Sequence, residues 1–302
     1  MLHTTTAKIK ETPRYDIATY PMVSPDLSNV RELTTGDTAE VQAFLSIRPV
    51  HTVVMSSFIV DNGIESELNR GKFYGYRNAA GELEGVALIG HSTLVEARSN
   101  EALRALAITA RNSETPIHLV MSSGDAANSF WQEMTDGLKE PRLTCVEALF
   151  DVSFPFPVRK TERKLKNADM SHLIQVAEAQ AEVAFIECGV DPMLKDREGF
   201  LKRVARRIEQ DRVFVVTEGD ELVFKADIIA ETDEVIYLEG VYVNEKYRGQ
   251  GIGSECLAAL TLELLDRADH ICMLSNVEFK GAHRSFEKAG FRKTDECVTL
   301  FV

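Results

Sequence analysis

Apolar positions in residues 158–302 follow two different periods. Runs with a period near 3.6 residues predict helices, and short β-branched or alternating runs predict strands. Within 197–210, for example, Leu201, Val204 and Ile208 fall on one helical face. The helices predicted in this way lie at 169–187, 197–210, 251–267 and 281–288. The predicted strands lie at 159–165, 213–217, 222–229, 235–243, 271–274 and 291–301.

A similar order of elements is predicted in the first half of the chain. The strands lie at 31–33, 72–77, 83–89, 117–121 and 143–152. The helices lie at 37–47, 50–60, 101–110 and 125–134. The prolines of 154–157 bar a helix and predict a stiff linker there. We therefore expect an α/β fold with an N-terminal extension (1–28) and two units, 29–152 and 158–302.

The segment after strand 235–243 is rich in glycine and leads directly into a helix. Its sequence over 248–253 is Arg-Gly-Gln-Gly-Ile-Gly. Such a turn leaves backbone N–H groups free of side-chain cover, and the helix dipole adds positive potential, so the pattern predicts a pyrophosphate site. The segment lacks the Lys-Ser/Thr end of a Walker A loop, and Ser254 stands where a dinucleotide loop has its third glycine. No comparable turn occurs near 91–99, so we expect a phosphate site only in the second unit.

Several segments resemble the GCN5-related N-acetyltransferase (GNAT) superfamily. The turn over 248–253 is similar to motif A of that family, which holds the pyrophosphate of acetyl-CoA. Segment 286–291, Phe-Glu-Lys-Ala-Gly-Phe, resembles the late Tyr-Glu-Lys-x-Gly-Phe segment of the family. Stretches 187–192, 224–227 and 240–243 resemble a bacterial group of two-part GNAT proteins.

The resemblance implies a fold and a cofactor. The fold would be α/β with two tandem GNAT-like domains, each a mixed, mostly antiparallel sheet flanked by helices, with 29–152 degenerate and 158–302 the acetyltransferase domain. Acetyl-CoA would bind with its pantetheine arm along the backbone of the strand before the turn. The cofactor-binding residues implied in this way are Val241, Tyr242, Val243, Arg248, Gly249, Gln250, Gly251, Ile252, Gly253 and Ser254.

Glu239 is the candidate general base. Strand alternation places it on one face with Val241 and Val243. A carboxylate on an otherwise apolar strand requires a reason, because unpaired burial is costly. A solvent-facing residue or a salt-bridge partner is the alternative. Tyr237, two residues earlier, could relay a proton or simply pack.

Two positions depart from the family pattern. Phe286 stands where the family has the tyrosine that protonates the leaving thiolate, and Phe279 stands where it has an asparagine. A thiolate is weakly basic, so its protonation by another group or by water remains open. His283, three residues before Phe286, is the nearest titratable side chain on the predicted helix.

The end of the helix predicted at 169–187 carries polar residues that in the family often line the acceptor pocket. They are Glu187, Cys188 and Asp191. An ordinary helix terminus, followed by Gly189 and Pro192, explains them equally.

Composition limits the partners. The formal net charge of −13 disfavours nucleic acid and anionic membranes. Five scattered cysteines, with no C-x-x-C pair, are typical of reduced thiols in a cytoplasmic protein. No metal and no apolar run long enough for a membrane span is expected. A homodimer remains possible.

The interpretation that combines these features is acyl-CoA-dependent N-acetyl transfer to the primary amine of a small molecule or an amino-acid derivative. An acyl-CoA-binding regulatory protein without turnover is the alternative, which Phe279 and Phe286 favour. A dinucleotide-binding enzyme is disfavoured, because several strands precede the glycine turn.

Overall fold

The computed structural model describes residues 27–154 and 161–302. In the first half the strands are β1 (Val30–Glu32), β2 (Gly71–Arg77), β3 (Leu83–Gly90), β4 (Ser92–Ala97), β5 (Leu119–Ser123) and β6 (Leu143–Val152). The helices there are α1 (Thr38–Leu45), α2 (Pro49–Asn62), α3 (Asn100–Arg111) and α4 (Ala126–Thr135). For every element except β4, for which the sequence prediction gave no range, these bounds agree with the prediction to within a few residues. The extension predicted at 1–28 lies almost entirely outside the described residues.

The second half repeats this element order. Its strands are β7 (Lys166–Asn167), β8 (Val213–Glu218), β9 (Glu221–Glu231), β10 (Val235–Val243), β11 (His270–Asn276) and β12 (Arg292–Phe301). Its helices are α5 (Leu173–Cys188), α6 (Pro192–Lys195), α7 (Arg197–Glu209), α8 (Ile252–Leu264) and α9 (Lys280–Lys288). The strand predicted at 159–165 is wrong for 161–165, and only the two residues of β7 pair with β8. Residues 155–160, including most of the predicted linker, lie outside the described residues.

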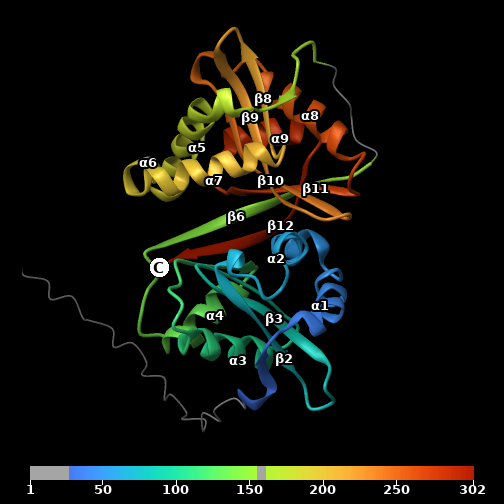
Figure 1. Ribbon diagram of the computed structural model, residues 1–302, viewed down its shortest axis with the longest axis vertical. Coiled ribbons are helices and arrows are strands. Elements are labelled where there is room, and N and C mark those ends of the chain that lie inside the picture. Colours follow the sequence, from blue (N-terminus) through green and yellow to red (C-terminus); the bar gives the residue numbers. More distant parts are fainter. Residues whose placement is uncertain (1–26, 155–160) are drawn as a thin grey trace, which may run out of the picture.

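All the strands within the described residues form one twelve-stranded sheet with the order β1-β2-β3-β4-β5-β12-β6-β11-β10-β9-β8-β7. Most neighbours are antiparallel, and the pairs β4·β5 and β10·β11 are parallel. Helices of the first half cover the lower part of the sheet in Figure 1, and those of the second half cover the upper part. The α/β class and the mostly antiparallel sheet with flanking helices are as the resemblance implied.

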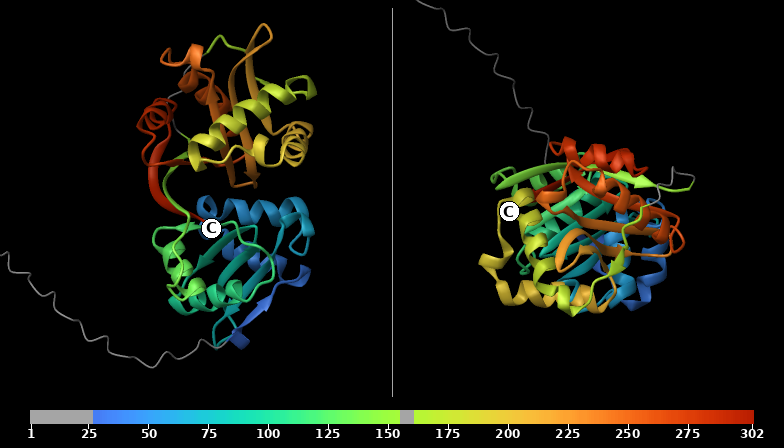
Figure 2. Two further views of the ribbon diagram at one scale, coloured as in Figure 1. Left: turned by 90° about the vertical axis from the view of Figure 1, so that its left-hand side faces the viewer. Right: turned by 90° about the horizontal axis from the view of Figure 1, so that it is seen from above.

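The two halves exchange their last strands at the centre of the sheet. β12, the last strand of the chain, lies between β5 and β6 of the first half. β6, the last strand of the first half, pairs in turn with β11 of the second half. Figure 1 shows β6 and β12 crossing the middle of the molecule side by side, and Figure 2 shows both running between the halves. Each half therefore depends on backbone hydrogen bonds from the other.

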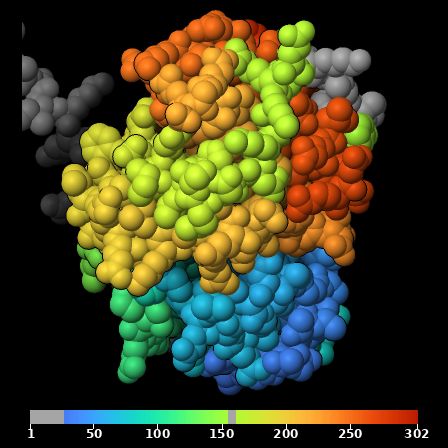
Figure 3. Space-filling view, turned by 45° about the horizontal axis from the view of Figure 1, so that its top comes forward, coloured from blue at the N-terminus to red at the C-terminus, as the bar shows by residue number. Residues whose placement is uncertain are grey.

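Side chains also pack across the junction. Val53 of α2 lies in one buried cluster with Leu149 of β6, Tyr237 of β10 and Cys272 of β11. Asp61 of α2 forms an ion pair with Arg212, with 2.7 Å between oxygen and nitrogen. In the space-filling view of Figure 3 the second half rests directly on the blue helices of the first half. Burial of this apolar cluster adds to the backbone pairing between the halves.

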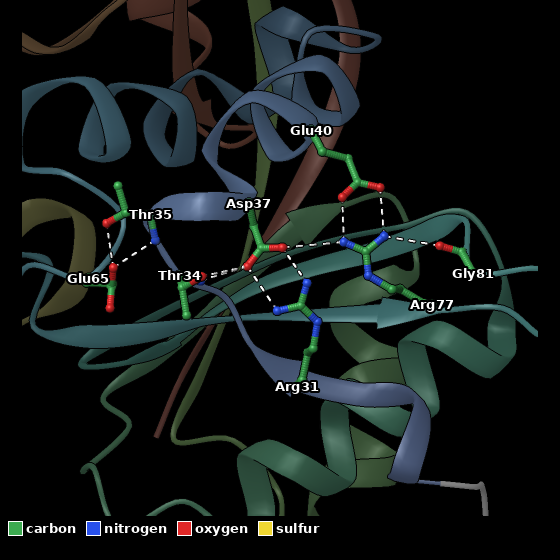
Figure 4. A network of polar contacts seen from close by, with 8 residues as sticks. All are labelled: Arg31, Thr34, Thr35, Asp37, Glu40, Glu65, Arg77 and Gly81. Carbon is green, nitrogen blue, oxygen red and sulfur yellow. Dashed lines mark hydrogen bonds and ion pairs between the residues drawn. The ribbon is translucent and has the colours of Figure 1, made fainter.

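A polar network fixes the start of the first half (Figure 4). Asp37, at the beginning of α1, accepts hydrogen bonds from Arg31 of β1 and from the backbone N–H of Thr34. Arg77 of β2 binds Glu40 of α1 and the carbonyl of Gly81 in the β2–β3 turn. The Arg31 guanidinium lowers the pKa of Asp37 to about 2, more than burial raises it. The network thus ties a strand, a helix and a hairpin together.

All five cysteines are described, and all are free thiols. Cys188 is partly exposed, and the other four are buried. Within 27–154 and 161–302, no helix combines the length and apolar character that crossing a membrane requires.

Candidate active site

A pocket opens where β10 and β11 separate. The two strands pair in parallel only from Val235–Leu238 to His270–Met273, although β10 continues to Val243 and β11 to Asn276. Beyond the last pair, the gap forms a cavity of about 230 Å³. It is lined by β10 from Leu238 to Val243, by β11 from Met273 to Ser275, and by side chains of α5 and α9. Unpaired backbone therefore faces this pocket.

β10 bends at a bulge within the pocket wall. Glu239 pairs with Asp227 of β9, but Tyr242 pairs with Lys225, so three steps on β10 match two on β9. Gly240 has φ of +58°, which favours glycine. Because the bulge shifts the alternation by one residue, the predicted common face of Glu239, Val241 and Val243 is wrong. Val241 and Val243 pack with the core beneath α8, whereas Glu239 lies on the opposite face.

Glu239 lies in the pocket wall and is hydrogen-bonded to Tyr237. The Tyr237 hydroxyl donates to Glu239 Oε1 at 2.9 Å. Burial raises the pKa of Glu239, and the hydrogen bond from Tyr237 partly opposes that rise. Tyr237 is buried at the junction of the halves, and burial raises the pKa of its hydroxyl well above 10. The pair supplies a proton acceptor held in place by a neutral donor.

Two further carboxyl groups approach Glu239 from other elements. Glu187, near the end of α5, lines the pocket with part of its side chain exposed, and desolvation by the surrounding atoms followed by the charge of Glu239 raises its pKa. Glu147 of β6 is supplied by the first half, and its carboxylate accepts a hydrogen bond from Thr299 at 2.5 Å. Burial raises the pKa of Glu147 to about 7, against the effect of that hydrogen bond, and the charge of Glu239 adds to the rise. Like charges this close disfavour simultaneous ionisation.

The glycine turn forms an open cradle at the start of α8. Gly249 and Gly251 have φ of +77° and +85°, and Gly251 caps the helix without a side-chain hydrogen bond. The first N–H groups of a helix have no partner within the helix, so they are available to a ligand. A Cβ on Gly253 would lie 3.0 Å from Val243, so the turn lies close against β10. The Ser254 hydroxyl turns back to the Gly251 carbonyl at 2.8 Å.

The remaining predicted cofactor residues surround this turn. Val241, Tyr242, Val243 and Arg248 line the pocket. Ile252 is buried in the core, and the Gln250 amide donates to the Lys246 carbonyl. Arg248 donates from Nε to the Val243 carbonyl at 2.8 Å and binds Glu182 of α5 at 2.9 Å. Its guanidinium therefore lies across the pocket mouth, between β10 and α5.

The two phenylalanines that depart from the family pattern both line the pocket. Phe279 precedes α9, and Phe286 lies within it and is buried. His283 is not among the lining residues. Its ring packs on Phe150 at 4.9 Å between centroids, and burial lowers its pKa. His283, the titratable side chain nearest Phe286 on the predicted helix, thus does not face the pocket.

The residues at the end of α5 divide into different roles. Glu187 faces the pocket. The Cys188 thiol donates to the Ala184 carbonyl at 3.1 Å. Asp191 accepts from the backbone N–H of Met193 at 2.8 Å and so caps α6. Glu187 alone among these three belongs to the pocket lining.

The equivalent region of the first half is filled by protein side chains. β4 and β5 also separate after three paired residues, but the cavity there is only about 30 Å³. Glu96 and Ser123 line this cavity, and Arg48 binds each of them at 3.1 Å. At the start of α3, the Ser99 hydroxyl accepts from the Ala102 N–H, which closes the position that is open in α8. The first half repeats the architecture without an open site.

Sequence reasoning missed Glu147 and the buried pair Lys225 and Asp227. Lys225 is fully buried and Asp227 is 2% exposed. Two opposite charges at alternate positions of the apolar strand 222–229 were a detectable signal of a buried pair. The sequence around Glu147 gave no sign that this residue lies near Glu239, because its position in space depends on which strands pair with β6.

The fold and the pocket define a domain that can bind a phosphate-bearing ligand. The phosphate would lie at the N-terminus of α8, and the rest of the ligand would lie between β10 and β11. Residues 209–293 match the family model described as an acetyltransferase (GNAT) domain. An acetyltransferase of the GNAT family from Colwellia psychrerythraea is similar over 90% of this chain and 98% of its own, with a TM-score of 0.57 and 14% identity. No curated protein matches the sequence.

Two further solved structures cover as much of the chain. A Drosophila protein has a TM-score of 0.64 and 12% identity over 90% of this chain and 98% of its own. A tandem GNAT protein from the clavulanic acid biosynthesis pathway has a TM-score of 0.53 and 10% identity, with the same coverage. At these identities the structures show the fold alone. The family match identifies residues 209–293 as a GNAT acetyltransferase domain, and the solved structures show that the fold of GNAT proteins extends over most of the chain.

Proposed function

We propose that the chain transfers an acetyl group from acetyl-CoA to the primary amine of a small molecule or an amino-acid derivative. The observation that carries the proposal is the uncapped N-terminus of α8 beside the gap between β10 and β11. An anion site and an unpaired strand edge are adjacent there. Glu239 lies in the wall of the same gap.

The residues of this site fit acetyl-CoA. Open N–H groups between 249 and 254 would hold its pyrophosphate, because they carry no side-chain cap and sit at the positive end of the helix dipole. The unpaired backbone of Val241–Val243 would hold the pantetheine arm. Arg248 would leave the Val243 carbonyl to make room and would offer its charge to a phosphate. The bound thioester supplies the acetyl group.

The chain's own groups account for the remaining chemistry. Glu239 accepts a proton from the acceptor ammonium, directly or through one water, and Tyr237 holds its carboxylate in place. The raised pKa of Glu239 brings its basicity closer to that of a proton acceptor near neutral pH. Val241 lines the pocket, and its backbone N–H would stabilise negative charge on the thioester oxygen. Phe286 offers no proton to the leaving thiolate.

A regulatory protein that binds acyl-CoA without turnover is the second candidate. Phe279 and Phe286 favour it, because both make the wall near α9 apolar. The same cradle serves both candidates, so only turnover distinguishes them.

The test is a thermal-shift titration with CoA and acetyl-CoA, followed by a panel of primary amines. Binding should raise the melting temperature, since a ligand at about 100 times its Kd stabilises the folded state by about 2.7 kcal/mol. Thiol release on addition of an amine supports acetyl transfer. Tight binding without thiol release on any amine favours the regulatory candidate, and no stabilisation by either ligand contradicts both.

A further inference from the structure

The buried pair of Lys225 and Asp227 has no role in the proposed transfer. Lys225 of β9 is fully buried next to the bulge of β10. Its ammonium donates to Gln180 Oε1 of α5 at 2.6 Å and to the Gly240 carbonyl at 3.1 Å. It also lies 2.9 Å from Asp227 Oδ1. Burial of a charge is expensive unless all its partners are present, so this arrangement requires a reason beyond packing.

The charge is held by a chain of partners. Asp227 binds Arg207 of α7 at 3.0 Å through its other oxygen. Burial lowers the pKa of Lys225, and the charge and hydrogen bond of Asp227 raise it. Since the Lys225 Nζ meets acceptors on α5, β9 and β10, we treat it as an ammonium. Residues of α5, α7, β9 and β10 therefore meet in one network around Lys225, which binds the Gly240 carbonyl.

The direction of that carbonyl fixes the next N–H group. In a trans peptide the C=O and N–H bonds point in opposite directions. The carbonyl of Gly240 points to Lys225, so the N–H of Val241, in the same peptide unit, points the other way. Both residues line the pocket, and Lys225 is not among its lining residues. The ammonium thereby keeps the Val241 N–H turned toward the gap between β10 and β11.

The contact of Lys225 and Gln180 with Gly240 leaves no space for a side chain at residue 240. A Cβ on Gly240 would lie 2.2 Å from Gln180 Oε1 and 2.6 Å from Lys225 Nζ. Gly240 also has the positive φ that glycine tolerates. The lysine, the glutamine and the glycine thus form one tightly packed unit around the peptide.

We propose that Lys225 is a positioning residue that orients the Gly240–Val241 peptide, so that the Val241 N–H donates to the carbonyl oxygen of the bound thioester. The proposal rests on the proposed function, because it presupposes that acetyl-CoA occupies the gap. It requires no contact between Lys225 and substrate.

The experiment is infrared difference spectroscopy with acetyl-CoA labelled with ¹³C at the thioester carbonyl, combined with calorimetric measurement of acetyl-CoA affinity. A hydrogen bond lowers the carbonyl stretching frequency, so the band of acetyl-CoA bound to the parent protein should lie below that of free acetyl-CoA. In Lys225→Met the band should return toward the free position, while the Kd stays near the parent value. On any amine that is accepted, kcat should fall with little change in KM, by less than the ~10²–10³-fold cost of deleting a donor.

The control is Lys202→Met, which removes an exposed lysine of α7 that pairs with Glu198. It should leave the band and the affinity unchanged. If Lys225→Met does not fold, the neutral double variant Lys225→Met/Asp227→Asn removes the buried charge pair together, which proteins often tolerate. Gly240→Ala perturbs the same peptide from the other side and should also move the band.

The outcomes separate the two proposals. A parent that does not bind acetyl-CoA overturns the proposed function and this inference together. A parent that binds acetyl-CoA with an unshifted band, or a folded Lys225 variant with the parent's band, overturns only the positioning role.

Discussion

Burial, more than direct ion pairing, sets the pKa values of the carboxyl groups in and next to the pocket. Glu239 of β10 and Glu187 of α5 line the pocket, Glu147 of β6 lies outside the lining, and desolvation is the first cause of the raised pKa in each. At neutral pH the group can therefore hold at least one proton. Such a pocket suits a proton acceptor next to a positively charged amine.

Replacing Glu239 by Gln should leave acetyl-CoA affinity nearly unchanged and reduce acetyl transfer by roughly 10²–10⁴-fold. The deficit should shrink as pH rises, because more of the amine is then already neutral. In the parent, the rate should rise with pH as Glu239 loses its proton, at a higher pH than for an ordinary Glu because its pKa is raised. Steady-state rates between pH 6 and 9 on an accepted amine check this.

The exposed Glu209→Gln, at the end of α7, is the matched control and should behave as the parent. If the rate is indifferent to Glu239→Gln, Glu239 has no part in proton transfer.

Replacing Phe286 by Tyr should leave the transfer rate equal or raise it, because the hydroxyl restores a proton donor for the thiolate at the pocket wall. The measurement is kcat on an accepted amine, with the melting temperature as a check on folding. A folded variant with a lower kcat would show that the apolar wall itself matters for turnover.

At the scale of elements, sequence patterns predicted most strands and helices because local periodicity reflects burial of one face. The strand 235–243 and the turn after it were located correctly for this reason. The bulge at Gly240 was not, since a glycine and two valines are compatible with a regular strand. The neighbours of β6 and β12 were not predictable either, because an apolar pattern specifies a strand and not its partner.

Changing Gly251 to Val should abolish the stabilisation of the protein by CoA. The residue has φ of +85°, which a β-branched side chain rarely adopts, and its Cβ would enter the cradle. The measurement is the change in melting temperature with CoA. Gly81→Val is the matched control, because Gly81 has the same φ of +85° in the β2–β3 turn, with open space around it. It should lower the melting temperature and keep the response to CoA. An equal response in both variants would place the CoA site elsewhere.

The network at the start of α1 should make stability depend on pH. The pKa of Asp37 is about 2 in the folded protein, below its ordinary value near 3.9 in an unfolded chain. A depressed pKa contributes stability that is present above about pH 4 and is lost as pH falls toward 2, roughly 2 kcal/mol in all. Asp37→Asn should therefore lower the free energy of unfolding at pH 7, with a difference that shrinks below pH 4.

Urea unfolding of both proteins at several pH values measures that difference. Glu67→Gln, on the exposed surface nearby, is the control and should change little at any pH. A pH-independent difference between Asp37→Asn and the parent would assign the loss to packing.

At the scale of the whole molecule, the two halves share one sheet, so they are not two independent domains joined by a linker. β12 is bordered on both sides by strands of the first half, and β6 borders β11. The described residues that line the candidate site all belong to the second half, and Glu147 of the first half interacts with Glu239 through its charge. Stability and function are therefore expected to be shared between the halves.

Fragments 1–154 and 161–302 should fail to fold when produced separately, because each would expose unpaired strand edges at the centre of the sheet. Mixed or co-expressed, they should associate and recover binding of CoA. Gel filtration, circular dichroism and calorimetry of the single and mixed fragments check this. A monomeric second fragment that binds CoA with the affinity of the full chain would show that the exchanged strands are dispensable.

The exchange of strands also constrains the order of events on the ribosome. β6 emerges early, yet both of its neighbours, β11 and β12, are made only near the end of the chain. At about 5–20 residues per second, the nascent first half waits for roughly ten seconds or more with the edge of β5 and both edges of β6 unpaired. During that interval a second nascent chain on the same message offers an equivalent strand. Pairing between the exposed β5 and β6 edges of two such chains would therefore compete with correct folding until translation ends.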